Sequence, residues 1–142
     1  MTRVDFYIVQ TTQASGRELL ACRLAEKAYI KGHQVYIQVN DSREAERLDK
    51  LLWTFRDGSF VPHTLAGGTQ TDAPVHIGHG DEPDGHNDVL ISLSNEVPLF
   101  FSRFQRVAEI VNQDEEQRSL ARIRYKFYKE RGYPLDTHEI TS

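Results

Sequence analysis

Apolar residues are grouped along the chain in short runs and in helical repeats, and their order predicts the arrangement of secondary structure. Residues 4–9 (VDFYIV) and 34–39 (QVYIQV) are rich in β-branched and aromatic side chains, which is typical of strands. Between them, apolar side chains recur every four residues over 16–31, which predicts a helix that ends before Gly32. This order of strand, helix and strand favours a parallel sheet with right-handed crossovers.

A second helix and a less regular segment follow. Asp41 and Glu44 have the spacing of a helix capping box, and the apolar stripe that comes after them ends at Trp53. Residues 54–71 are predicted to be irregular, and residues 74–77 to form a short strand. A second crossover helix therefore follows the second strand.

The C-terminal half contains the clearest strand pattern of the chain. Residues 88–93 (DVLISL) predict a buried central strand, residues 98–104 a helical turn and residues 106–111 the last strand. A final helix is expected over residues 114–131. Since the 142 residues contain no repeat and no long linker, we expect one α/β domain over residues 1–142, with a mostly parallel sheet flanked by helices.

Composition and charge restrict the partners and the cellular compartment expected for such a domain. The formal net charge is −4, which argues against a protein that coats nucleic acid. Cys22 is the single cysteine, so no intramolecular disulfide can form and a reducing compartment is expected. The first ten residues become polar too early for a signal peptide, and no apolar run is long enough to span a bilayer. We therefore expect a cytoplasmic protein without a membrane contact.

Positive charge is concentrated in the predicted final helix. Between residues 118 and 131 there are six lysines and arginines and one glutamate. A rotation of about 100° per residue puts Leu120, Ile123 and Phe127 on one face, which we expect to pack on the sheet. The opposite arc holds Arg118, Arg122, Tyr125, Lys126 and Lys129.

This basic arc, with a tyrosine inside it, suits a short acidic peptide that ends in an apolar residue. Guanidinium groups bind carboxylates through paired hydrogen bonds, and an aromatic ring can cover an apolar side chain. Two other interpretations stay open: the charges solvate the outer face of a helix, or they contact the phosphates of a nucleic acid.

Other motifs give no positive sign of catalysis or of a cofactor. The segment after the first strand (QTTQASGRE) lacks both a G-x-G-x-x-G pattern and a G-K-[ST] ending, and the AGGT turn at residues 66–69 lacks a lysine. Cys22 falls within a helix, where a buried structural thiol is usual. The nearest approach to a metal site is a loop cluster whose spacing matches no zinc motif. This cluster comprises His76, His79, Asp81, Asp84, His86 and Asp88. We expect no catalytic residue, metal or cofactor; the alternative class is a small Rossmann-like nucleotide-binding enzyme.

The segment that begins at the end of the second helix is rich in aromatic residues for a connection. Its apolar side chains either complete the core or leave a patch for a protein partner, and both interpretations stay open. They are Trp53, Phe55, Phe60, Val61, Pro62 and Leu65.

Several segments together resemble the chi subunit of the bacterial DNA polymerase III holoenzyme. The matching stretches are DFYIV at 5–9, ERLDKLLW at 46–53, SFVPHTLAGG at 59–68, DVLISL at 88–93 and SLARIRYKFYKERGYPL at 119–135. The resemblance covers nearly the whole chain. It implies a non-catalytic subunit of Rossmann-like fold that pairs with the psi subunit, which links it to the clamp loader. It also implies binding of the acidic C-terminal tail of the single-stranded DNA-binding protein, with DNA contacted only indirectly.

The resemblance further implies which residues form the two contacts. It assigns the acidic tail to a set that overlaps the basic arc: Val111, Arg118, Arg122, Tyr125 and Lys126. It assigns the psi subunit to Trp53, Phe60 and Pro62, with His63 at the edge of the contact. The acidic loop at residues 80–87 receives no role.

Overall fold

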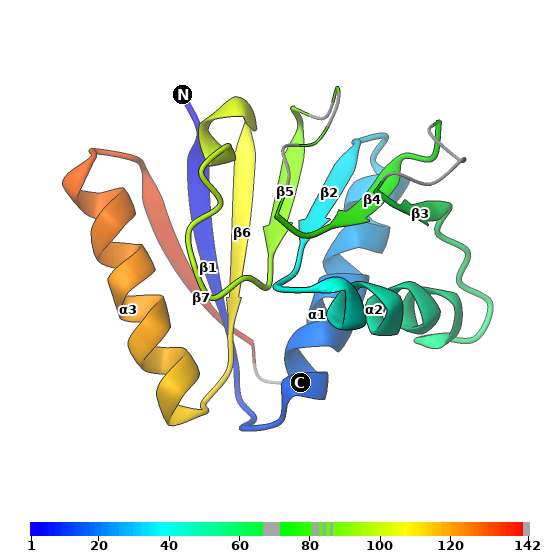
Figure 1. Ribbon diagram of the computed structural model, residues 1–142, viewed down its shortest axis with the longest axis horizontal. Helices are drawn as coiled ribbons and strands as arrows, with labels where there is room; N and C mark the ends of the chain where they lie inside the picture. The colour runs from blue at the N-terminus through cyan, green and yellow to red at the C-terminus, as the bar shows by residue number, and fades with distance from the viewer. Residues whose placement is uncertain (67–71, 81–82, 84, 86, 141–142) are drawn as a thin grey trace.

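The computed structural model describes residues 1–66, 72–80, 83, 85 and 87–140. Within these residues the chain forms one sheet of seven strands in the order β3-β4-β2-β5-β6-β1-β7 (Figure 1). All neighbouring strands of the sheet are parallel, which confirms the predicted α/β class. The strands are β1 (Arg3–Val9), β2 (Val35–Gln38), β3 (His63–Leu65), β4 (Val75–Gly78), β5 (Val89–Ser92), β6 (Arg106–Val111) and β7 (Leu135–Ile140).

Helices pack on both faces of the sheet. α1 (Ala14–Ile30) and α2 (Ser42–Thr54) lie on one face, and α3 (Glu115–Glu130) lies on the other (Figure 1). The predicted helical turn is confirmed as a 3-10 turn (Phe101–Arg103), and the ring of Phe101 packs against Phe127 and Tyr128 of α3. The three predicted helices are confirmed, with ends that differ by one or two residues. Within the described residues, no helix is long and apolar enough to cross a bilayer.

Each face of the sheet has its own hydrophobic core. Ile37 and Ile91 pack with the inner side chains of α1 and α2. Tyr36 and Leu90, their neighbours in the same strands, pack with aromatic side chains on the α3 side. Because successive strand residues point to opposite faces, a strand that is buried on both sides has a continuous apolar run, as residues 89–91 do within β5.

Local hydrogen bonds account for where two of the elements begin and end. The Asp41 carboxylate accepts a hydrogen bond from the backbone N–H of Glu44 at 2.9 Å, which confirms the predicted cap of α2. The Glu44 carboxylate in turn accepts from the backbone N–H of Asn40 at 2.9 Å. Gly32 follows α1 with a φ of 88°, a left-handed conformation that glycine adopts without strain.

Two strands were not predicted. The expectation that residues 106–111 form the last strand is wrong, because β7 follows α3 and pairs with β1 along its whole length. β7 is an edge strand and four of its six residues are exposed, so it lacks an apolar run. The expectation that residues 54–71 are irregular is wrong for β3, whose three residues pair with β4.

Candidate functional site

A buried carboxylate holds α3 on the sheet. Glu109 of β6 is fully buried, and Arg124 of α3 donates from Nε to Oε1 of this carboxylate at 3.0 Å. The Tyr128 hydroxyl donates to the other oxygen, Oε2, at 2.7 Å. Burial raises the pKa of Glu109, while Arg124 and Tyr128 oppose that shift. Burial and the nearby carboxylate raise the pKa of Tyr128, so its hydroxyl keeps the proton that it donates.

The face of α3 that contacts the sheet therefore differs from the predicted one. The expectation that Leu120, Ile123 and Phe127 pack on the sheet is wrong for Ile123, which is 67% exposed. Leu120 is half-buried, and Phe127 is half-buried with its ring against the core cluster on this side of the sheet. The buried residues of α3 are Ala121, Arg124 and Tyr128. The physical reason is Glu109, since a buried carboxylate needs a cation and a hydrogen-bond donor opposite it. Glu109 is absent from the candidates taken from the sequence, although a glutamate inside the apolar strand RVAEIV indicates such a pair.

Three cations of the set assigned to the acidic tail lie on the outside of α3. Arg118, Arg122 and Lys126 are exposed, and they follow one another at the spacing that keeps side chains on one side of a helix. Among the described residues, neither arginine has an ion pair. Lys126 Nζ lies 3.7 Å from Glu130 Oε1, and an exposed pair of this kind is weak. The guanidinium groups are therefore available to a carboxylate from outside.

The two apolar members of that set lie between these cations and the core. Tyr125 is half-buried and meets Phe6 edge-to-face, with ring centroids 5.3 Å apart. Val111 is 5% exposed and belongs to the core cluster against which Tyr125 packs. We call Arg118, Arg122, Tyr125 and Lys126 the basic face; Val111 lies below it and has almost no surface of its own.

A second exposed surface is aromatic. Trp53 is 49% exposed and Phe60 is 63% exposed, and their rings stack with centroids 5.8 Å apart. His63 is buried, 4.3 Å from the Trp53 ring between centroids. Its ring nitrogens lie 2.6 Å from the Val61 carbonyl oxygen and 2.9 Å from that of Asp49, so the imidazole cannot rotate without losing both contacts.

We call Trp53, Phe60, Pro62 and His63 the aromatic patch. Pro62 is half-buried. The sequence left open whether the apolar residues of this segment complete the core or form a surface patch. Val61 belongs to the core and has no exposed surface, and Phe55 and Leu65 pack partly against that core. Trp53 and Phe60 instead remain at the surface, where a stacked pair of large rings is a feature typical of protein contacts.

The two surfaces lie at opposite ends of the sheet. β3 and the end of α2, which carry the aromatic patch, are at one side of the molecule in Figure 1, and α3 is at the other. The sheet thus separates an aromatic surface from a basic one.

The crevice in which Rossmann-like enzymes bind nucleotides is occupied by a side chain. Arg17 is buried and donates from Nε to the Ile110 carbonyl and from Nη2 to the Leu93 carbonyl, both at 3.1 Å. These carbonyls lie at the carboxyl ends of β6 and β5, where a phosphate would be expected. A Cβ on Gly16 would collide with the side chain of Thr11, so this glycine permits a close internal contact. The geometry therefore gives no support to the nucleotide-binding alternative.

The remaining candidates from the sequence are distributed as follows. Cys22 is buried, and burial raises the pKa of its thiol to about 12. Asp88 binds the His33 ring at 2.9 Å. The rest of the loop cluster falls partly on residues 81, 84 and 86, which lie outside the described residues. Among the residues that are described, no group of three possible metal ligands is found.

Comparison with known proteins identifies the family. The family model of the DNA polymerase III chi subunit, HolC, matches residues 1–136. The DNA polymerase III subunit chi of Pseudomonas aeruginosa is 46% identical over 140 residues, which cover 99% of this chain and 98% of the relative. The subunit chi of Escherichia coli is 35% identical over 143 residues, covering 96% and 97%, and that of Haemophilus influenzae is 32% identical over 138 residues, covering 96% of both. The chain therefore belongs to the DNA polymerase III chi subunit family.

Proposed function

We propose that this protein is a non-catalytic adaptor of the bacterial replicative polymerase in the cytoplasm. It binds the acidic C-terminal tail of the single-stranded DNA-binding protein at the basic face and the psi subunit at the aromatic patch. Through psi it links the clamp loader to the coated lagging-strand template, and these two protein contacts reach DNA only indirectly. The observation that supports this proposal most is the presence of two exposed surfaces of different chemistry at opposite ends of one sheet.

The chemistry of the basic face fits an acidic peptide with an apolar end. Arg118 and Arg122 offer planar forks that bind carboxylates with two hydrogen bonds, and Lys126 adds a point charge. Tyr125 borders the cations with a ring that can cover an apolar side chain. Charge-assisted hydrogen bonds contribute about 1.5–3 kcal/mol each, so a few of them with one buried side chain reach micromolar affinity, about 8 kcal/mol.

The aromatic patch fits a partner with an apolar surface. Stacked, exposed rings bury a large area at little cost in side-chain entropy, which is why tryptophan is common among the residues that dominate protein contacts. The His63 ring, held by two backbone carbonyls, packs against the Trp53 ring and limits its movement.

The tail contact can be tested by fluorescence anisotropy with a labelled acidic peptide ending in Ile-Pro-Phe. We expect micromolar binding that weakens with added salt, because the cations of the basic face are exposed. Arg122→Ala should weaken binding about tenfold or more, since it removes charge-assisted hydrogen bonds. Deletion of the terminal Phe of the peptide should also abolish most of the binding.

Arg43→Ala is the matched control, because Arg43 is an exposed arginine on α2. It removes the same charge at a distant place and should leave the affinity unchanged. Equal affinities of the Arg122→Ala variant and the original protein, both folded, would contradict a tail site on the basic face.

The psi contact can be tested by isothermal titration of the purified psi subunit. Trp53→Ala and Phe60→Ala should each weaken binding by more than about tenfold if these rings dominate the contact. Leu99→Ala is the control, because Leu99 is 89% exposed and lies outside the patch. Unchanged psi binding by both patch variants would exclude this surface as the contact.

Direct binding of DNA by α3 is the competing function that the exposed cations leave open. It predicts a steep linear fall of the logarithm of affinity for single-stranded DNA with the logarithm of salt concentration, and loss of that binding in the Arg122→Ala variant. The adaptor proposal predicts that Arg122→Ala changes the affinity for the acidic peptide and leaves any affinity for single-stranded DNA as it was.

A further inference from the structure

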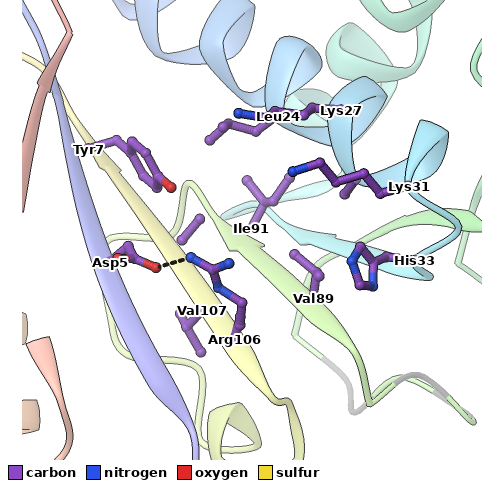
Figure 2. Close-up of a pocket in the computed structure, with 12 residues that line it drawn as sticks. Asp5, Tyr7, Leu24, Lys27, Lys31, His33, Val89, Ile91, Arg106 and Val107 are labelled. Atoms are coloured by element: carbon purple, nitrogen blue, oxygen red, sulfur yellow. Dashed lines mark hydrogen bonds and ion pairs between the residues drawn. The ribbon is translucent and has the colours of Figure 1, made fainter. Parts of the chain in front are cut away.

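A pocket lies on the face of the sheet opposite α3, between the end of α1 and the first residues of β5 and β6. Its volume is about 200 Å³ (Figure 2). The walls come from α1 and from the strands β1, β5 and β6. Ligands of Rossmann-like folds bind at the carboxyl ends of the strands, where Arg17 lies. This pocket lies at the opposite, amino-terminal ends of β5 and β6 and is therefore a different site.

The pocket is lined by more positive than negative charge. Lys27 of α1 and Lys31, the residue directly after this helix, extend over its floor (Figure 2), and Arg106 borders it from β6. Among the described residues, neither lysine ammonium has an ion-pair partner. Asp5 is the one carboxylate that lines the pocket, and it is already occupied: Arg106 Nη2 lies 2.8 Å from Oδ2 and His138 Nε2 lies 2.9 Å from Oδ1. The charge of the two lysines is therefore uncompensated.

The floor below these cations is apolar and made largely by the sheet. Val89, Ile91 and Ala108 contribute to it, and Leu24 and Ala28 close it from the side of α1. Tyr7 stands at one end of the pocket, where its ring stacks on that of His138 at 4.8 Å between centroids. A flat apolar floor with an aromatic wall and cations at the rim accepts a planar group joined to an anion.

We propose that this pocket binds one nucleotide unit, with its base on the sheet floor beside Tyr7 and its phosphate between Lys27 and Lys31. The unit is either a free nucleotide or one nucleotide of a single strand. Two convergent ammonium groups suit phosphate, whereas the paired guanidinium groups of the basic face suit carboxylate. A pocket of about 200 Å³ is too small for a helix or a folded partner.

The proposal is independent of the two protein contacts, because the pocket and α3 lie on opposite faces of the sheet. It can be tested by fluorescence anisotropy of a labelled deoxythymidine octamer with the full chain at low salt. Competition with unlabelled dTMP and with inorganic phosphate forms the second arm. We expect Lys27→Ala/Lys31→Ala to weaken binding of the octamer about tenfold or more, since it removes two charge-assisted contacts.

The matched control is Arg43→Ala/Lys50→Ala, which removes two exposed positive charges from α2. All four residues are exposed, so both variants should melt at the temperature of the original protein. Competition by dTMP supports a free nucleotide as the ligand, and binding of the octamer alone supports a single strand. The proposal is overturned if the pocket variant and the control variant lose affinity for the octamer to the same extent, or if phosphate competes as well as dTMP. It is also overturned if the pocket variant loses affinity for the acidic peptide instead of for the octamer.

Discussion

At the scale of single residues, Glu109 determines which side chains of α3 face the solvent. Arg124 is held inward by this carboxylate, and each step along a helix turns by about 100°. Arg122 and Lys126 lie two residues from Arg124 on either side and are therefore turned outward. The basic segment of the sequence is thus divided between one structural arginine and several exposed cations.

Replacement of Arg124 by leucine should be strongly destabilising. It leaves the Glu109 carboxylate buried without its cation, and loss of one partner of a buried pair costs about 3–5 kcal/mol. Because burial already raises the pKa of Glu109, loss of the cation favours its protonated form further, so the deficit should shrink as the pH is lowered. Urea unfolding at pH 5 and pH 8 measures both effects.

The double variant Glu109→Gln/Arg124→Leu is the control for this prediction. It removes the uncompensated charge and should recover part of the lost stability at pH 8. A single variant as stable as the original protein would show that the pair does not hold α3 in place.

Asp5 should make stability depend on pH in the acid range. Burial by itself raises the pKa of this carboxyl, but hydrogen bonds and charge from Arg106 and His138 outweigh burial and leave the pKa below its ordinary value. A carboxyl with a lowered pKa stabilises the fold above its unfolded pKa, and this contribution is lost as the pH falls through the folded pKa. Asp5→Asn should therefore lower stability at pH 7 and flatten the acid limb of the stability curve.

Urea unfolding at steps from pH 7 to pH 3 measures the acid limb, with Asp57→Asn as the control because Asp57 is an exposed aspartate. Identical acid limbs for Asp5→Asn and the original protein would contradict the prediction.

At the scale of elements, α3 is stabilised at both ends by residues outside the basic face. The Asp114 carboxylate accepts from the backbone N–H of Gln117 at 3.1 Å, and Glu115 and Glu116 lie in the first turn. Gly132 takes a φ of 78° after the last turn. Acidic residues at the start and a glycine after the end suit the helix dipole and the free backbone groups.

Asp114→Ala should therefore lower the free energy of unfolding by about 1 kcal/mol, the usual cost of losing an N-cap side chain. Its effect on affinity for the acidic peptide should be small, because Arg122 lies two turns further along. Thermal unfolding and peptide titration of the same variant measure both quantities, with Glu116→Ala as the exposed control. A loss of affinity as large as that of Arg122→Ala would contradict the separation of cap and binding face.

At the scale of the whole molecule, the sheet keeps the basic face and the aromatic patch apart. Their elements are separated by the intervening strands, so neither partner would touch the other's surface (Figure 1). Effects at distant sites without shared partners usually add to within about 0.3–0.5 kcal/mol. If the proposed contacts are correct, two partners would bind at once with little coupling between them.

The affinity for the acidic peptide should therefore change by no more than about twofold when the psi subunit is present at saturation. Trp53→Ala should leave peptide binding unchanged, and Arg122→Ala should leave psi binding unchanged. Anisotropy titrations with and without psi measure the coupling. A tenfold change in either direction would show that the sheet transmits a change between its ends.

The local pattern of the sequence was sufficient to predict much of the fold. Residues 106–111 form the predicted strand, and Asp41 begins the second helix as predicted, because burial on both faces and helix capping each leave a pattern within a few residues. The strand β7 could not be found in this way, since an edge strand with solvent on both sides has no apolar run.

The residues assigned to the two candidate surfaces remain predictions, and which of them are exposed was decided by the tertiary structure. The sequence alone could not separate Val61, which is buried, from Phe60, which is exposed one position earlier. It also placed Ile123 inward, because an apolar stripe is normally the buried one. What is buried depends on the side chain that arrives from a distant strand. The side chain that meets α3 is the Glu109 carboxylate of β6. Arg124 and Tyr128 of α3 therefore face inward and Ile123 faces outward.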